Sequence, residues 1–413
     1  MGLRTMKFGG SSVADAEKIK NVARRIAAAR EAGDDVVAVV SARGKTTDGL
    51  VELAYEISDR PDPREMDMLL STGERISCAL MAMALQDLGH SAISFTGSQA
   101  GIVTDDSHTK AKIMEIRSER LREALDGGSI VLVAGFQGVS TGGRNVTTLG
   151  RGGSDTTAVA LAAALDADVC EIYTDVTGVF TADPRVEPGA RKLALVSHEE
   201  MLEMAATGSK VLALRAVEFA RRHDVPLHVR SSFLPEEGTW ITKETPDMEN
   251  AIVTGLSHRS DEAKVMVTGV EDRPGVAAHI FTALADRNLN VDTIIQNQAV
   301  GGGADVTFTV PLDELRPALE TLDAMRGELG YREVSSDDQI GKVTLIGAGM
   351  KSEPGIAAKM FRVLADEGIN LQMIDTSTIR ITVVIDRREV ERAVRALHDA
   401  FDLASEAARR ADV

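Results

Sequence analysis

Short apolar runs alternate with amphipathic stretches over the first 230 residues of the chain. The runs predict strands at residues 3–8, 36–40, 91–95, 129–134, 169–174 and 226–230. The amphipathic stretches predict helices near residues 15–32, 48–58, 64–87, 115–126, 198–206 and 210–223, and an apolar run of helix-forming residues predicts a further helix at 154–166. Residues 36–40, Val-Val-Ala-Val-Val, are apolar at every position, as in a strand buried on both faces. This alternation predicts an α/β domain with a mostly parallel sheet sandwiched by helices.

Polar segments follow four of the predicted strands directly. They begin at Gly9, Ser41, Phe136 and Thr174. The carboxyl ends of parallel strands lie at one edge of a sheet, and α/β domains bind their ligands at that edge. We therefore expect the four segments to converge on one site.

Residues 147–157 join a glycine-rich loop to the start of an apolar helix. We predict that Ser154 or Asp155 caps this helix. Free backbone N–H groups at the helix start suit an anion, and Arg151 offers a planar fork for a carboxylate or a phosphate. Taken alone, the segment also fits an ordinary capped core helix after a turn.

The sequence changes character at residues 232–250, which collect proline and acidic residues, and we place a domain boundary near residue 250. An internal repeat follows, because residues 273–281 match residues 353–361, which lie 80 positions later. Each copy predicts a ferredoxin-like βαββαβ unit with a Pro-Gly turn at a helix start, where backbone N–H groups suit a small anion. On pattern alone, a duplicated dimerisation platform is the alternative.

Composition and charge exclude several classes of function. The 413-residue chain has a formal charge of −17, which argues against a nucleic-acid or membrane-surface binder. No apolar run approaches the roughly 18–20 residues that span a bilayer, and the N-terminus lacks the shape of a signal peptide, so we expect a cytoplasmic protein. Cys78 and Cys170 lie in apolar surroundings, and the histidines show no ligand spacing. We therefore expect no disulfide and no metal site built by the protein.

Two glycine-rich segments imitate nucleotide-binding motifs. Residues 43–46 end like a Walker A loop, but Val39 stands where the first glycine belongs. Residues 347–352 approach a dinucleotide fingerprint, but Ser352 replaces its third glycine and the segment lies in the second repeat copy. We predict that neither binds a nucleotide.

The predicted sheet edge collects the side chains that carry chemistry. They are Lys7, Ser41, Thr47, Glu74, Arg151, Ser154, Asp155, Thr174, Asp175 and Lys210. The cations suit phosphates, Glu74 suits an ammonium group, and Arg151 suits a carboxylate. This equipment fits phosphoryl transfer to a small amino acid, with Mg²⁺ bridging phosphate oxygens.

Three motifs, in this order, resemble the aspartate kinases (aspartokinases) of the amino-acid-kinase superfamily. Residues 7–13, KFGGSSV, resemble their N-terminal signature, and residues 148–155, TLGRGGSD, resemble their substrate loop. Residues 174–185, TDVTGVFTADPR, resemble their nucleotide loop, and the repeat resembles their tandem ACT domains. The resemblance covers nearly the whole chain and is greatest to short bacterial forms inhibited by lysine and threonine.

The resemblance implies ATP-dependent phosphorylation of L-aspartate to 4-phospho-L-aspartate, the first step of lysine, threonine and methionine biosynthesis. Lys7 would neutralise the transferring phosphoryl group. Glu74 would bind the ammonium group of aspartate and Arg151 a carboxylate. Ser41, Thr47 and Ser154 would complete the substrate site, with Asp155 supporting it as a catalytic residue.

The same resemblance implies a nucleotide site for ATP, with Mg²⁺ bound mainly through the phosphates. Its residues would be Lys7, Gly9, Gly10, Thr174, Asp175, Phe180, Asp183, Arg185 and Lys210. Many relatives have tyrosine at the position of Phe180. Stacking on adenine would survive this change, whereas a hydroxyl contact would be lost.

For the repeat, the resemblance implies effector sites for lysine, threonine or both, formed where ACT copies pair in a homo-oligomer or between catalytic and regulatory subunits. The effector residues would be Asp272, Arg273, Pro274, Gly275, Val276, Ala277, Gln296 and Asn297. The implied domains are a catalytic domain (1–250), a first ACT domain (264–336), and a second built from 251–263 plus 337–413. Met248 lies just before the regulatory region, and some relatives make a separate regulatory subunit from an internal start.

Each assignment has a structural alternative. Lys7 could be a surface lysine, Asp155 could only cap its helix, and Lys210 could be solvated. Glu74 could be an ordinary exposed helix residue, or it could pair with Arg75 or with a distant cation. Two other functions also fit the chain. It could be another carboxylate or carbamate kinase on the same fold, or a non-catalytic amino-acid sensor built on the ACT copies.

Overall fold

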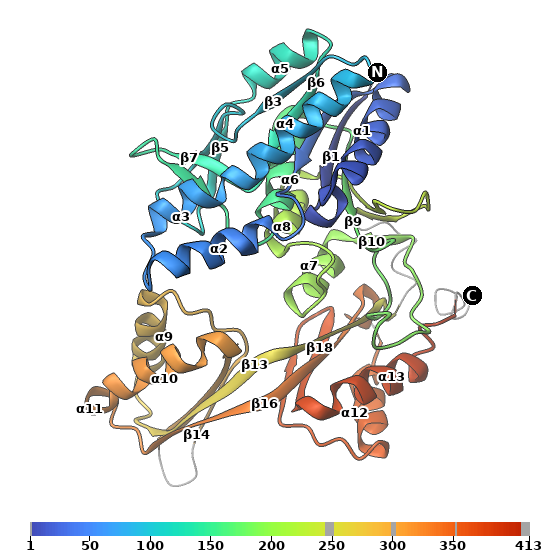
Figure 1. Cartoon of the computed structure of the whole chain (residues 1–413). Coiled ribbons are helices and arrows are strands. Elements are labelled where there is room, and N and C mark those ends of the chain that lie inside the picture. The colour runs from blue at the N-terminus through green and yellow to red at the C-terminus, as the bar shows by residue number, and fades with distance from the viewer. Residues whose placement is uncertain (1, 244–251, 299–302, 352, 406–413) are drawn as a thin grey trace. The chain divides into compact units, whose positions relative to one another are not determined.

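The computed structural model describes residues 2–243, 252–298, 303–351 and 353–405, and Met248 lies outside these ranges (Figure 1). The chain forms two compact units. Unit 1 comprises Met1–Phe180 and Lys192–Glu249, and unit 2 comprises Thr181–Arg191 and Asn250–Val413. Our sequence interpretation assigned residues 181–191 to the first domain, whereas in the structure they belong to unit 2.

An eight-stranded sheet forms the centre of unit 1. Its order is β10 (Leu195–Ser197), β12 (Thr239–Thr242), β11 (Leu227–Ser231), β9 (Val169–Thr174), β1 (Leu3–Phe8), β2 (Asp35–Val40), β6 (Ile130–Ala134) and β3 (Ala92–Phe95). Among these strands every pairing is parallel except β11 with β12. The predicted mostly parallel sheet is therefore confirmed.

Helices cover both faces of this sheet. The α-helices in the described part of unit 1 are α1 (Ala16–Glu31), α2 (Thr46–Ile57), α3 (Pro63–Leu70), α4 (Thr72–Asp87), α5 (Glu119–Asp126), α6 (Gly153–Leu165), α7 (His198–Ala206) and α8 (Leu214–His223), and α3 packs on β8 (Val146–Thr148) of a smaller sheet rather than on this one. On one face, α1 and α4 pack against the alternate side chains Met6 and Phe8 of β1. On the other, α6 lies on β1, β2 and β9 and is covered by α8. Lys7 of β1 points to the α6 side because neighbouring residues of a strand face opposite ways.

Unit 1 also contains a smaller four-stranded sheet that our sequence interpretation did not predict. Its order is β5 (Ile113–Ile116), β4 (Ile102–Thr104), β7 (Gln137–Ser140) and β8 (Val146–Thr148). Strands of three or four residues are too short to show a period. The helix predicted near 115–126 is therefore wrong at its start, because Ile116 pairs with Ile102 in β4.

Two other predicted helix boundaries also need correction. The helix expected over 64–87 divides at Ser71. The hydroxyls of Ser71 and Thr72 donate to the carbonyls of Met68 (3.0 Å) and Leu69 (2.7 Å) and so compete with the helical hydrogen bonds. The helix expected from residue 210 begins only at Leu214.

The stretch Pro63–Asp87, which spans α3 and α4, is the one helical stretch of the described residues that is long and apolar enough to cross a bilayer. This corrects our expectation that no segment reaches that length. Half of its most apolar window is buried, and Met81 and Leu85 lie in the core with α1 and the sheet. In the structure it therefore packs as a core element of unit 1.

Unit 2 contains one six-stranded antiparallel sheet with helices packed on it. The strand order is β14 (Ile294–Gln298), β15 (Ala304–Pro311), β13 (Gly255–Val270), β16 (Glu333–Ile346), β18 (Arg380–Asp386) and β17 (Met373–Thr376). The helices are α9 (Val276–Asp286), α10 (Leu315–Ala324), α11 (Arg326–Leu329), α12 (Ile356–Asp366) and α13 (Val390–Ala400).

The two repeat copies of unit 2 share their central strands. Figure 1 shows the long strands β13 and β16 running through both copies. Leu256 of β13 lies in the core with α12 and α13, whereas Val265 of the same strand lies in the core with α9 and α10. Ala182 and Val186, from the segment Thr181–Arg191, pack into the first of these cores.

Candidate active site

The loops after neighbouring strands of unit 1 are joined at one edge of the sheet. The Gly9 N–H donates to the carbonyl of Tyr173 (3.3 Å) and the Ser41 N–H to that of Phe8 (3.1 Å). The Gly135 N–H donates to the carbonyl of Val40 (3.2 Å). The loops after β1, β2, β6 and β9 therefore converge, as the alternation of strands and polar loops predicts.

Lys7 and Asp155 form an ion pair at this edge. The Lys7 Nζ lies 2.6 Å from the Asp155 Oδ1, and the two side chains are 12% and 11% exposed. Asp155 is the third residue of α6, so its carboxylate lies in the first turn, where the helix dipole favours negative charge. The pair places a nearly buried cation beside the start of α6, which suits the neutralisation of a phosphate.

The start of α6 differs from our prediction that Ser154 or Asp155 is its cap. The N-cap is Gly152, at φ 74°, and it makes no side-chain hydrogen bond. This left-handed conformation favours glycine, and an added Cβ would lie 2.4 Å from the Cβ of Ala213. Asp155 is not used as a cap, and its carboxylate pairs with Lys7 instead.

Glu74 is a buried carboxylate near the same edge, in the first turn of α4. It is 3% exposed, and its Oε1 accepts from the Ala42 N–H (3.2 Å). Its Oε2 is buried and has no hydrogen-bond partner among the described residues. Burial raises the pKa of the Glu74 carboxyl to about 7.

The suggested pairing of Glu74 with Arg75 is wrong. The Arg75 Nε donates to the Gln137 Oε1 (3.2 Å) and its Nη2 donates to the Ser71 Oγ (3.2 Å). Arg75 therefore braces α4 against β7.

Arg151 lies in the loop between β8 and α6. Its side chain is exposed, and no described residue forms an ion pair with it. The loop itself is anchored by two residues that sequence reasoning missed. Asp67 accepts from the Thr148 hydroxyl (2.5 Å), and Arg215 donates to the Leu149 carbonyl (2.8 Å). No sequence signal marked them, because a charged residue on an amphipathic helix is usually solvated.

The other predicted substrate residues lie around this edge. Ser41 follows β2 and Thr47 is the second residue of α2, and both are half-buried. Ser154 is buried, and its Oγ would lie 2.7 Å from a Cβ added to Gly135. The lack of a side chain at Gly135 therefore lets the start of α6 approach the end of β6.

The predicted nucleotide residues divide between the two units. Unit 1 holds Lys7, Gly9, Gly10, Thr174, Asp175, Phe180 and Lys210. The Thr174 Oγ1 donates to the Asp175 Oδ1 (3.0 Å), and Phe180 pairs with Lys192 through an antiparallel bridge. Lys210 is exposed in the loop between α7 and α8.

Asp183 and Arg185 belong to unit 2 and are not among the residues that unit 1 brings together. The Arg185 Nη2 lies 2.7 Å from the Asp183 Oδ2. Hydrogen bonds from Arg185 lower the pKa of the Asp183 carboxyl.

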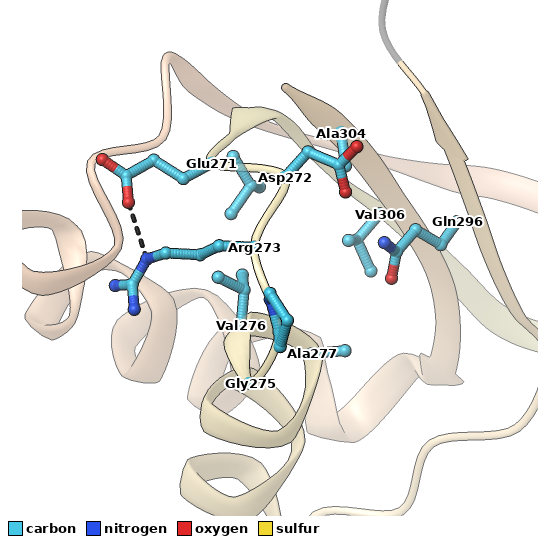
Figure 2. A pocket seen from close by; sticks show the side chains of 11 residues that line it. Glu271, Asp272, Arg273, Gly275, Val276, Ala277, Gln296, Ala304 and Val306 are labelled. Carbon is cyan, nitrogen blue, oxygen red and sulfur yellow. Dashed lines mark hydrogen bonds and ion pairs between the residues drawn. The ribbon is translucent and has the colours of Figure 1, made fainter. Parts of the chain in front are cut away.

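A pocket of about 340 Å³ opens in unit 2 at the start of α9 (Figure 2). Its lining includes Asp272, Arg273, Pro274, Gly275, Val276, Ala277 and Gln296 but not Asn297. Gly275 caps α9 at φ 99°. Figure 2 shows Arg273 turned toward Glu271, and the Arg273 Nε donates to the Glu271 Oε2 (2.7 Å). The Asp272 Oδ2 accepts from the Gln298 Nε2 (3.1 Å).

One group of potential metal ligands occurs within the described ranges. It consists of Glu187, His398 and Asp399 in unit 2, whose ligand atoms lie within 4.8 Å of one another. The His398 Nε2 is within hydrogen-bond distance of the Thr181 Oγ1 (2.9 Å). This contact ties the segment Thr181–Arg191 to α13.

Three family models match the chain. A model for the amino acid kinase family matches residues 4–231, and two ACT domain models match residues 264–327 and 343–401. An aspartokinase of Mycolicibacterium smegmatis is 58% identical over 407 residues, which cover 98% of this chain and 97% of that protein.

Solved structures with the same architecture include aspartokinase III of E. coli. Its complex with aspartate and ADP is 27% identical with a TM-score of 0.81, over 97% of this chain and 100% of that one. Its complex with lysine and aspartate is 28% identical with a TM-score of 0.73, over 96% of this chain and 99% of that one.

Proposed function

Because the chain belongs to the aspartokinase family and is an aspartate kinase, an enzyme that phosphorylates aspartate with ATP, we propose that the carboxyl edge of the unit 1 sheet is its active site. The observation that carries this proposal is Glu74. A buried carboxylate oxygen without a partner is costly, and an ammonium group from a ligand would satisfy it.

Aspartate binds between Glu74 and Arg151 in this proposal. Glu74 takes the ammonium group, and the fork of Arg151 takes a carboxylate. Ser41, Thr47 and Ser154 supply hydrogen bonds to the rest of the substrate. The exposed guanidinium of Arg151, unpaired within the described part of the chain, and the open oxygen of Glu74 support these roles.

Lys7 and Asp155 serve the transfer step. An oxygen of the aspartate side-chain carboxylate attacks the γ-phosphorus, the bond to the bridging oxygen of ADP breaks, and 4-phospho-L-aspartate forms. Lys7 neutralises charge on the transferring group, and Asp155 holds the Lys7 ammonium in place at 2.6 Å. The N–H groups at the start of α6 add positive potential.

The nucleotide occupies the neighbouring loops in this proposal. Gly9 and Gly10 let its phosphates approach the backbone, and Phe180 stacks on the base. Thr174, Asp175 and Lys210 complete the part of the site that unit 1 supplies. The complex of aspartokinase III with ADP supports nucleotide binding in this family. Asp155 already pairs with Lys7, so Mg²⁺ would be held mainly by the phosphates, where it neutralises their charge.

We further propose that lysine, threonine or both inhibit the enzyme by binding the unit 2 pocket. The pocket suits an amino acid because it joins the N-terminus of α9 to the carboxylate of Asp272 and the amide of Gln296. The complex of aspartokinase III with lysine supports an amino-acid effector. Pairing of ACT copies between chains would make the protein an oligomer, or an assembly of catalytic and regulatory subunits. We place it in the cytoplasm, at the first step of lysine, threonine and methionine biosynthesis.

The test is a substrate panel with the full chain. Aspartate, ATP and Mg²⁺ should release ADP and give an acyl phosphate that hydroxylamine traps. Glutamate, N-acetylglutamate and carbamate should release no ADP above background. Turnover of one of these in preference to aspartate would contradict the proposed site, and effector binding without any turnover would favour an amino-acid sensor.

A further inference from the structure

Asp67 and Arg215 lie 148 positions apart in the sequence and contact the same two loops of unit 1. One is the part of residues 148–155 that connects β8 to α6 and carries Arg151, residues 149–152, and the name substrate loop is kept for these four residues from here on. The other is the crossing loop, residues 105–112, which connects β4 to β5. Neither Asp67 nor Arg215 has a role in the proposed reaction.

Asp67, in α3, is completely buried. It accepts hydrogen bonds from the Thr148 Oγ1 (2.5 Å), immediately before the substrate loop, and from the Thr109 N–H (3.1 Å) in the crossing loop. The Nδ1 of His108, also in the crossing loop, lies 2.6 Å from the second oxygen of Asp67. A fully buried carboxylate needs such donors, so the positions of both loops are tied to this side chain.

Arg215, in the first turn of α8, joins the same two loops from another element. Its Nη1 donates to the carbonyl of Leu149 (2.8 Å) and its Nη2 donates to the carbonyl of Ala111 (3.0 Å). The planar guanidinium fixes the separation of the two carbonyls. The Ala111 N–H also donates to the Thr148 carbonyl (2.9 Å), so the loops are directly hydrogen-bonded as well.

We propose that Asp67 and Arg215, the loop clamp, are positioning residues that set Arg151 for the carboxylate of aspartate. This inference rests on the proposed role of Arg151. No described residue holds the exposed Arg151 guanidinium, so its position depends on the backbone on either side. Gly152 fixes that backbone on the α6 side, and the loop clamp fixes it on the β8 side. Binding aspartate then orders one side chain rather than a whole loop.

The test compares the steady-state kinetics of Asp67→Asn, Arg215→Met, Thr148→Val and Arg151→Ala. Asp67→Asn and Arg215→Met should each raise KM for aspartate by about tenfold or more, because small displacements of a positioned group are costly. KM for ATP should stay within about twofold. Thr148→Val, which removes one donor to Asp67, should have a smaller effect of the same kind. Arg215→Lys should recover only part of the aspartate affinity that Arg215→Met loses, since one ammonium group cannot reproduce the two hydrogen bonds of the planar guanidinium.

Double variants separate the clamp from the substrate site. Added to Arg151→Ala, the clamp variants should raise KM for aspartate no further, because the residue that they position is gone. A readout independent of catalysis is the rate of tryptic cleavage after Arg151. The clamp variants should be cut faster than the unmodified enzyme. When residue 151 is changed by Arg151→Lys, which trypsin also cleaves, the clamp variants should still be cut faster than the same enzyme without them.

One control variant accounts for general loss of stability. Arg4→Met removes an arginine that bonds Asp34 and Glu171 at the start of β1, the end of that strand opposite to Lys7. It should leave KM for aspartate and the cleavage rate unchanged.

The outcomes distinguish the two proposals. An unchanged KM in Arg151→Ala would reject the role of Arg151, while faster cleavage of the clamp variants would still establish the clamp. A raised KM in Arg151→Ala with unchanged KM and cleavage in Arg215→Met and Thr148→Val would reject the clamp alone. If Asp67→Asn does not fold, Arg215→Met and Thr148→Val decide the question, because both leave the Asp67 carboxylate in place.

Discussion

Glu74 places an ionisable carboxylate in a site where its side chain is almost fully buried. One of its oxygens has a backbone donor and the other has no partner among the described residues. The charged form is therefore disfavoured until a cation arrives, which is why the pKa of the carboxyl rises to about 7. If Glu74 ionises fully only beside a bound cation, the affinity for that ligand depends on pH.

The first prediction concerns the pH dependence of KM for aspartate. Below pH 7 the Glu74 carboxyl is mostly protonated in the free enzyme, and in the proposed site the ammonium group of aspartate must displace that proton. KM for aspartate should therefore rise as pH falls below 7, by at most about tenfold per pH unit. Glu74→Gln should have a high KM that is flat between pH 6 and 8. A Glu74→Gln profile as steep as that of the unmodified enzyme would assign the titration to another group.

The second prediction concerns stability and has the opposite sign. The pKa of Glu74 is about 7 in the folded state against an ordinary 4.5. Folding therefore becomes less favourable as pH rises from 4.5 to 7, and above pH 7 the cost reaches about 3 kcal/mol at most. Glu74→Gln removes this cost, so thermal unfolding should show the variant gaining stability relative to the unmodified enzyme from pH 5 to pH 8. A stability difference independent of pH would contradict the burial argument.

Lys7 is the residue-scale test of the transfer step. Lys7→Ala removes the cation and leaves Asp155 without its partner, so kcat should fall by about 10²-fold or more while KM for aspartate changes little. The control is Lys20→Ala, an exposed lysine on α1, which should behave like the unmodified enzyme. An equal fall in both variants, or a change in KM alone, would remove Lys7 from the transfer step.

At the scale of elements, different residues at the start of α6 cap the helix and pair with Lys7. Gly152 ends the substrate loop in a left-handed conformation, and Asp155 is thereby left to pair with Lys7. A conventional cap by Ser154 or Asp155 would have engaged a side chain with the helix backbone. The helix start therefore joins the residues proposed to bind aspartate and phosphate on one rigid element.

Two glycine substitutions test this arrangement. Gly152→Ala requires a strained φ and places its Cβ 2.4 Å from that of Ala213, so it should destabilise unit 1 by about 1–3 kcal/mol and raise KM for aspartate. Gly49→Ala lies in the interior of α2, where an added Cβ meets nothing within 4 Å, and should stabilise the enzyme by about 0.5–1 kcal/mol. Chemical denaturation measures both. Equal effects of the two substitutions would show that Gly152 has no special conformational role.

At the scale of the whole molecule, the regulatory unit is not a simple appendage. Its two copies share strands β13 and β16, and a segment from the middle of the catalytic sequence, Thr181–Arg191, contributes Ala182 and Val186 to one of its cores. The Arg395 Nε of α13 also donates to the Val186 carbonyl (2.8 Å). This segment also carries Asp183 and Arg185, which our sequence interpretation assigned to the nucleotide site.

The molecular-scale prediction is allosteric inhibition through the unit 2 pocket. Millimolar lysine, threonine or their mixture should lower activity, and Gln296→Ala should weaken this inhibition by at least about tenfold without changing basal activity. Thr376→Ala changes the equivalent position in the second repeat copy and should leave inhibition through the first-copy pocket intact. Flat activity with both amino acids, singly and together, would refute the proposed regulation.

Much of the fold follows from the sequence because its signals are local. Apolar runs specify the central strands of unit 1, amphipathic periods specify α1 and α7, an apolar run of helix-forming residues specifies α6, and self-similarity at 80 positions specifies the repeat in unit 2. The convergence of the four polar loops follows as well, since parallel strands leave no other edge for them. The short strands β4, β5, β7 and β8 were missed because three or four residues show no period.

The sequence by itself determined the family, the two-part organisation and the candidate residues Lys7, Glu74, Arg151 and Asp155. Only the tertiary structure decided which of these contact one another and which other groups hold them. The burial of Glu74, the pairing of Lys7 with Asp155, and the contacts of Asp67 and Arg215 all join residues more than 30 positions apart. Such contacts leave no periodic trace in a single sequence, because hydrogen bonds and burial depend on packing in space rather than on neighbours along the chain.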